Sequence, residues 1–322
     1  MGRRFQGFVI VAMVAIASVV AAQVHVDVRL VNVVATVTDA RGRTIPNLTA
    51  DDFILEADGT PQKITHFTQD QNVPVSVGIL LDTSGSMDRK IRTALESVER
   101  FSRRIHPNDE IFLITFSGHP VLRQDFTDDR DKLSQSLHHL NATGGTALYD
   151  ALHEGITKIQ SGRHSKRAIL LITDGQDTAS FVKFDEVVQS IRQSDVLIYP
   201  IGISGLTYAK GPDIFMPGSI TALLPSEPAR SVQSKRDEVD LNVLHAIADN
   251  SGGRAFLIAE TLVNRGSQIE KVLDAIADEL RGQYTLGFYP SRPDDGHYHS
   301  LRVRTRSGNA VRARRGYIAA AS

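Results

Sequence analysis

The feature that most constrains the fold is a repeated alternation of apolar strands and amphipathic helices between residues 73 and 282. Residues 75–81 form an unbroken apolar run, which is typical of a central strand buried on both faces. The next apolar residues recur at helical spacing, at Ile91, Leu95, Val98, Phe101 and Ile105. Further strands are predicted at 111–116, 168–172, 196–203 and 256–259, and further helices at 148–159, 181–191, 240–251 and 269–280. This order predicts an α/β domain of Rossmann-like class, with a doubly wound, mostly parallel sheet and helices on both faces.

Two strand-rich segments, 23–72 and 283–322, flank this domain. Each has only about three short strands, too few to bury a face well alone. We therefore expect them to pack together as one small β-sandwich, with the α/β domain inserted between them. Residues 204–238 are rich in Gly, Pro and Ser and lack periodicity, so they are predicted to be an irregular insertion.

The first 22 residues have the composition of an export signal. Arg3 and Arg4 precede an apolar stretch that ends in small residues. We expect an exported bacterial protein that is periplasmic, secreted or associated with the cell envelope. The alternative is a retained membrane anchor, which would bring the chain into contact with the membrane.

The net charge and the lack of cysteine exclude some classes of partner and one source of stability. A formal net charge of -1 does not favour a nucleic-acid partner, because such proteins gain affinity by neutralising phosphates. The chain has no cysteine, so its stability comes from its core and from bound metal rather than from disulfides.

Polar side chains follow two of the predicted strands at the point where each strand ends. Asp82, Ser84 and Ser86 follow the first strand, and Asp174 follows another. Thr146 lies just before a predicted helix. Ligands of open α/β sheets bind at the carboxyl ends of the strands, so we expect these side chains to meet there.

Together these motifs resemble the metal-ion-dependent adhesion site of von Willebrand factor type A (VWA) domains. The resemblance covers roughly residues 73–281, and it includes the flanking sequences LLDTSGSM, GGTALYDAL and LLITDGQD. With the preceding strands and the later YTLGFYP segment, the whole chain resembles the bacterial proteins called VWFA-related. The resemblance implies a metal held by Asp82, Ser84, Ser86, Thr146 and Asp174, with the two aspartates acting directly or through water.

Every proposed ligand atom is oxygen, which favours a hard divalent ion. We predict Mg²⁺, with Ca²⁺ or Mn²⁺ as alternatives. Two carboxylates neutralise such an ion, which leaves the site able to accept another anion. The resemblance implies that this anion is an Asp or Glu side chain of a protein partner.

Simpler interpretations exist for each motif alone. Asp82 and Ser84 are good helix N-caps, and Asp174 with Gly175 is an ordinary turn pair. A phosphate-binding loop at Gly144 is not supported, because no Gly-Lys-Ser/Thr follows. An aspartic protease needs Gly immediately after Asp-Thr, and a dehalogenase-type phosphatase needs Asp two residues after the first, but Ser84 occupies that position.

Other polar residues do not form a catalytic motif. No histidine lies in a recognisable triad. Asp177, the one further candidate base, is interpreted as a loop cap. Exposed positions are predicted for His138 and His139 on a helix, for His297 and His299, and for Arg302, Arg304 and Arg306 on a strand. We therefore predict a binding protein rather than an enzyme, with no small-molecule substrate. A metal-tied scaffold and a metal-dependent hydrolase are the alternatives.

Overall fold

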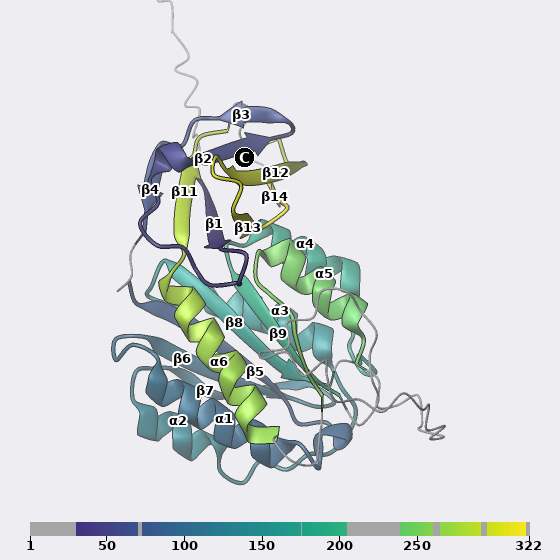
Figure 1. Ribbon diagram of the computed structural model, residues 1–322. Helices are drawn as coiled ribbons and strands as arrows, with labels where there is room; N and C mark the ends of the chain where they lie inside the picture. Colours follow the sequence, from purple (N-terminus) through teal and green to yellow (C-terminus); the bar gives the residue numbers. More distant parts are fainter. Residues whose placement is uncertain are drawn as a thin grey trace, which may run out of the picture.

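The computed structural model describes residues 30–69, 73–174, 176–204, 239–259, 265–290 and 295–319. They form two stacked units, a β-sandwich and an α/β unit (Figure 1). The predicted export signal, residues 1–22, and nearly all of the predicted insertion, residues 205–238, lie outside the described residues.

The α/β unit is built on a six-stranded sheet of order β10-β9-β8-β5-β6-β7. Its strands are parallel except for β7, which pairs antiparallel with β6 at the edge. This confirms the predicted sheet. The strands are β5 (Val75–Asp82), β6 (Glu110–Phe116), β7 (Pro120–Thr127), β8 (Lys166–Thr173), β9 (Leu197–Ser204) and β10 (Phe256–Ala259).

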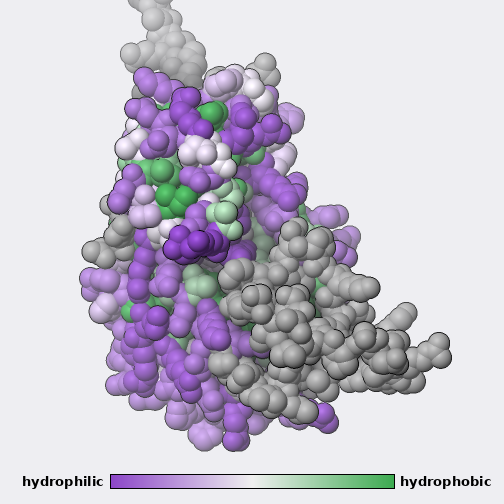
Figure 2. All heavy atoms as spheres, in the orientation of Figure 1, coloured by the Kyte–Doolittle hydropathy of each residue, from purple (hydrophilic) through white to green (hydrophobic). Residues whose placement is uncertain are grey.

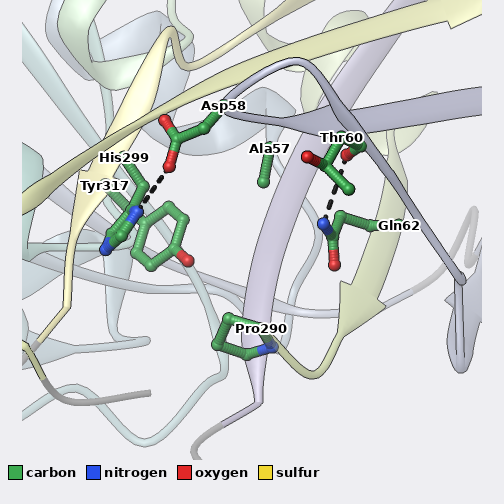
Figure 3. Close-up of a pocket in the computed structure, with 7 residues that line it drawn as sticks. All are labelled: Ala57, Asp58, Thr60, Gln62, Pro290, His299 and Tyr317. Carbon is green, nitrogen blue, oxygen red and sulfur yellow. Dashed lines mark hydrogen bonds and ion pairs between the residues drawn. The ribbon is translucent and has the colours of Figure 1, made fainter. Parts of the chain in front are cut away.

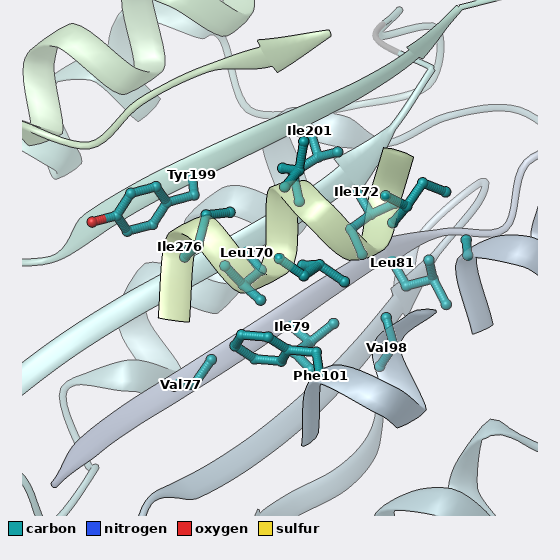
Figure 4. Packing of buried hydrophobic residues seen from close by; sticks show 14 of the residues in the cluster. Val77, Ile79, Leu81, Val98, Phe101, Leu170, Ile172, Tyr199, Ile201 and Ile276 are labelled. Atoms are coloured by element: carbon teal, nitrogen blue, oxygen red, sulfur yellow. The ribbon is translucent and has the colours of Figure 1, made fainter. Parts of the chain in front are cut away.

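Helices cover both faces of this sheet, and each face has its own apolar core. On one face, Val98 and Phe101 of α1 and Ile276 of α6 pack over the central strands (Figure 4). Burial of such side chains contributes about 1.5–3 kcal/mol each. One face carries α1 (Ile91–Arg104), α2 (Arg130–Leu137) and α6 (Arg265–Arg281), and the other carries α3 (Leu148–Ile159), α4 (Phe184–Gln193) and α5 (Leu241–Ser251).

The β-sandwich confirms that the strand-rich segments before and after the α/β domain pack together. Its sheets have the orders β13-β1-β11-β4 and β14-β12-β2-β3, so each combines strands from before and after the α/β unit. The N-terminal strands are β1 (Val31–Thr38), β2 (Phe53–Ala57), β3 (Thr60–Gln62) and β4 (His66–Thr68). The C-terminal strands are β11 (Tyr284–Phe288), β12 (Tyr298–Thr305), β13 (Ala310–Ala313) and β14 (Gly316–Ile318).

Two short segments of the sandwich are divided between its two sheets. Residues 62–68 form the end of β3 and then β4, and residues 310–317 form β13 and then β14. At the second crossing the Arg314 guanidinium is buried, and it donates to the carbonyl of Ser194 in the α/β unit at 3.1 Å. Neither segment has apolar residues at a regular spacing of two, so sequence periodicity does not reveal the crossing.

A buried polar cluster joins the two units. The Glu279 carboxylate on α6 accepts hydrogen bonds from Tyr199 Oη on β9 at 2.8 Å and from the Arg312 guanidinium on β13. Thr36 on β1 donates to the same carboxylate at 3.4 Å. Helix α6 is therefore fixed to the sandwich at its C-terminal end.

Most of the molecular face shown in Figure 2 is hydrophilic, and its small hydrophobic areas are most evident over the sandwich. Within the described residues, no helix is both long enough and apolar enough to span a membrane.

Candidate metal centre

The predicted ligands lie at the carboxyl edge of the parallel sheet. Strands β5 and β8 are parallel neighbours, with Leu81 paired to Ile172. Asp82 and Asp174 therefore leave the sheet at the same edge, each just past this pair. Both are buried, with relative exposures of 0% and 6%.

The β5 loop draws its three polar side chains together. Asp82 Oδ1 accepts the Ser84 backbone N–H at 2.8 Å, and Oδ2 accepts the Thr173 hydroxyl at 2.7 Å. Ser84 Oγ lies 3.0 Å from Ser86 Oγ. Burial raises the pKa of Asp82 to about 6; hydrogen bonds from Ser84 and Thr173 oppose the rise, and the nearby Asp174 carboxylate adds to it.

Thr146 belongs to a loop that is hydrogen-bonded to the β5 loop. The backbone N–H of Gly85 donates to the Gly144 carbonyl at 3.0 Å, and that of Thr143 donates to the Thr83 carbonyl at 2.8 Å. The Thr146 side chain is buried at 5% exposure. The Thr146 N–H donates to Thr178 Oγ1 at 2.9 Å, so this residue also contacts the loop that follows β8. The structure thus brings all the predicted ligand residues to one edge, on loops that are bonded to each other.

Sequence reasoning missed a buried lysine at this edge. Lys90 Nζ donates to Asp174 Oδ2 at 3.2 Å and to the Ile203 carbonyl at 3.3 Å. The lysine side chain is 7% exposed. The available signal was its position just before α1 and one turn before Ala94, in line with the apolar face of the helix, where a solvated lysine is not expected.

The loop after β8 is fixed to the start of α3. Asp177 Oδ1 accepts the Leu148 N–H at 2.9 Å, as expected for a loop cap. The Asp150 carboxylate accepts the backbone N–H of Phe181 at 3.0 Å and of Val182 at 2.8 Å. The predicted helix start at Phe181 is wrong, because α4 begins at Phe184 and Phe181 stays in the loop with its side chain 93% exposed.

The donor set fits a hard divalent ion. Two carboxylates and three hydroxyls come from loops held by backbone hydrogen bonds, and all of their ligand atoms are oxygen. Nowhere in the described part of the chain, this edge included, is a group of three or more His, Cys, Asp or Glu side chains arranged to hold a metal, so the ion would depend on hydroxyls beside the two carboxylates.

The histidine predictions had mixed outcomes. His138 and His139 are exposed as expected, but they follow α2 rather than lying in it. His297 is exposed, whereas the surface prediction for His299 is wrong. Its ring is buried, and it bridges Asp58 Oδ2 at 2.7 Å and Asp295 Oδ1 at 3.0 Å.

His299 stacks on Tyr317, with ring centroids 5.2 Å apart, beside a hollow of about 430 Å³ (Figure 3). Burial alone would lower the pKa of His299, but hydrogen bonds from its ring to Asp58 and Asp295 outweigh this and raise it. The exposed arginines at 302, 304 and 306 lie on β12 and just after it, as predicted.

Comparison with known proteins identifies the class of the α/β domain. The family model for the von Willebrand factor type A domain matches residues 77–176. The structure of proximal thread matrix protein 1 from the mussel byssus has the same fold, with 13% identity, a TM-score of 0.50, and coverage of 70% of this chain and 51% of that chain. A von Willebrand factor type A protein from Catenulispora acidiphila shows 11% identity and a TM-score of 0.49, with coverage of 91% of this chain and 74% of that chain.

A sequence relative is the uncharacterized protein sll0103 of Synechocystis sp., which is 27% identical over 112 residues. The match covers 34% of this chain and spans only 27% of that relative's length. The matched family model and the arrangement of the sheet define the class: the chain contains a von Willebrand factor type A domain.

Proposed function

We propose that this VWA domain binds a divalent ion, Mg²⁺ by preference, and uses it to capture an Asp or Glu side chain of a protein partner. The observation that carries the proposal is the burial of Asp82 and Asp174 at one sheet edge, beside hydroxyls on mutually bonded loops. Asp82, Ser84, Ser86, Thr146 and Asp174 would hold the ion. When bound, the ion supplies a positively charged coordination position for a carboxylate.

The arrangement favours binding over catalysis. A metal-dependent hydrolase needs a base free to activate water. Asp177 is the nearest candidate by sequence, but its carboxylate oxygen accepts the Leu148 N–H at 2.9 Å and also a hydrogen bond from the Ser180 hydroxyl. An acid already committed to these donors is a poor base.

An exposed aromatic side chain on the loop after β8 supports a protein partner. Phe181 follows the site loop, and the carboxylate of Asp150 fixes its backbone while its side chain is 93% exposed. Large aromatic side chains held in place before binding are frequent anchors of protein interfaces. We infer a partner surface that presents a carboxylate next to an apolar patch.

We further propose that the protein is exported and acts in or outside the cell envelope, on the strength of the composition of residues 1–22. A metal that only ties the loops together remains the second candidate, because the same ion would also stabilise the loops it bridges.

A phage-displayed random peptide library tests the proposal directly. Selection on the immobilised protein with Mg²⁺ should enrich peptides that contain Asp or Glu, and their binding should be lost with chelator. Asp82→Ala should bind none of them, whereas Asp58→Ala, which removes an exposed carboxylate of the sandwich, should bind them as the wild type does. Enrichment that is indifferent to Mg²⁺ or unaffected by Asp82→Ala would contradict the proposal.

A further inference from the structure

Lys90 puts a positive charge beside the proposed metal ligands. Its ammonium lies 3.2 Å from Asp174 Oδ2, and both side chains are nearly inaccessible, at 7% and 6% exposure. Of the buried charged residues in the described part of the chain, Asp82, Asp174 and Lys90 are the ones at this edge of the sheet. The charge of the site is therefore set by these residues.

The charge balance changes what the loaded site can bind. Two carboxylates and one ammonium leave the empty site with one excess negative charge. A divalent ion converts this to one excess positive charge, whereas the same site without Lys90 would become neutral. A buried positive charge without a partner is costly, and a carboxylate ligand removes that cost.

We propose that Lys90 is a built-in counter-ion that weakens divalent-ion binding and makes the loaded site a receptor for a single carboxylate. This inference rests on the proposed metal-binding function and specifies the charge of its ligand. The ammonium repels the incoming ion and competes with it for Asp174. A bound carboxylate offsets that repulsion, so ion and acidic partner should each strengthen the binding of the other by the same factor.

A purely structural role for Lys90 makes the opposite prediction. Lys90 directly precedes α1 and donates both to Asp174, just after β8, and to the Ile203 carbonyl of β9 at 3.3 Å, so it ties the start of this helix to the ends of both strands. If the lysine only positioned the loops, its loss would disorder the ligands and weaken ion binding. If it acts as a counter-ion, its loss strengthens ion binding. The sign of the change separates the two roles.

The experiment is calorimetric titration of the whole protein with MgCl2 at low ionic strength and about pH 8, above the raised pKa of Asp82. Lys90→Met removes the charge but keeps an apolar chain of similar length. Arg89→Met makes the same change of charge at the exposed neighbouring residue and serves as the matched control.

We expect Lys90→Met to bind Mg²⁺ at least about tenfold more tightly than the wild type, because a buried like charge is removed, and Arg89→Met to stay within about twofold. Unchanged or weaker binding by Lys90→Met would overturn the counter-ion role while leaving the metal site intact. Binding by neither protein would overturn the metal site and this role with it. Binding by Lys90→Met alone would support the role in its strongest form.

A second variant keeps the test valid if Lys90→Met does not fold. Lys90→Gln removes the charge but retains an N–H donor for the Ile203 carbonyl, and it should show the same increase in affinity. Melting temperatures with and without Mg²⁺ give an independent readout, since the ion should stabilise both neutral variants more than it stabilises the wild type.

Discussion

The sheet edge of the VWA domain and the part of the sandwich around His299 each bring two aspartates and one basic side chain together. At the sheet edge these are Asp82, Asp174 and Lys90, and in the sandwich they are Asp58, Asp295 and His299. The two clusters differ in burial. The Asp58 and Asp295 side chains are 53% and 33% exposed, whereas Asp82 is fully buried and Asp174 is 6% exposed.

This difference supports a structural role for the sandwich cluster and the proposed ion-binding role for the sheet edge. Water screens the carboxylates in the sandwich, and both ring nitrogens of His299 already have carboxylate partners. At the sheet edge, the donors to Asp82 among the described residues are neutral, and Lys90 pairs with Asp174 rather than with Asp82. Excess negative charge that is buried in this way favours a bound cation, whereas the sandwich cluster is already complete.

The largest effect on metal-free stability is expected from Lys90→Met. This change leaves Asp174 buried without its ionic partner, and breaking a buried pair costs about 3–5 kcal/mol. Urea unfolding in the presence of chelator measures the loss, with Arg89→Met as a control that should stay within about 0.5 kcal/mol of the wild type. A loss no larger than in the control would show that the sheet-edge pair resembles a surface pair.

A smaller, pH-dependent effect is expected from His299→Gln. The pKa of His299 is raised in the folded protein, so the stability from its two ionic contacts is fully present below the unfolded value of about 6.5 and is lost as pH rises through the folded value. We expect a loss on the order of 1 kcal/mol at about pH 5.5 and a smaller loss at about pH 9.

His297→Gln is the matched control, since that side chain is 82% exposed. Unfolding of both variants at the two pH values gives the comparison. A loss from His299→Gln that grows with pH would contradict the bridging role, and an effect on Mg²⁺ affinity would contradict the separation of the two clusters.

The smallest effect on stability is expected from Phe181→Ser. Its side chain is already exposed, so the free energy of unfolding should change by less than about 0.5 kcal/mol. If the sheet edge is the binding region, the same change should weaken Mg²⁺-dependent binding of the selected acidic peptides by about tenfold, in line with loss of an interface anchor. Leu122→Ser, at an exposed position on the edge strand β7, should leave peptide binding unchanged.

Sequence patterns predicted most of the α/β unit, because a strand buried on both faces and a helix buried on one have distinct hydrophobic periods. They did not reveal β7, an edge strand without a fully buried residue, or the crossings between the sandwich sheets. The short-range motifs predicted which polar residues meet at one edge of the sheet. Long-range partners were not predictable: Lys90 and Asp174 are 84 residues apart, and Asp58 and His299 are 241 apart.

The central claim is that the sheet edge binds a divalent ion and the sandwich cluster does not. Thermal unfolding of the wild type, Asp82→Ala and Asp58→Ala, each with Mg²⁺ and with chelator, tests it most directly. We expect Mg²⁺ at a hundredfold excess over Kd to stabilise the wild type and Asp58→Ala by about 2.7 kcal/mol. Asp82→Ala should remain folded, because the α/β core holds its loops, and should not respond to Mg²⁺. The account would be contradicted if the wild type melted identically with Mg²⁺, Ca²⁺, Mn²⁺ and chelator, or if Asp82→Ala gained as much stability from the ion as the wild type.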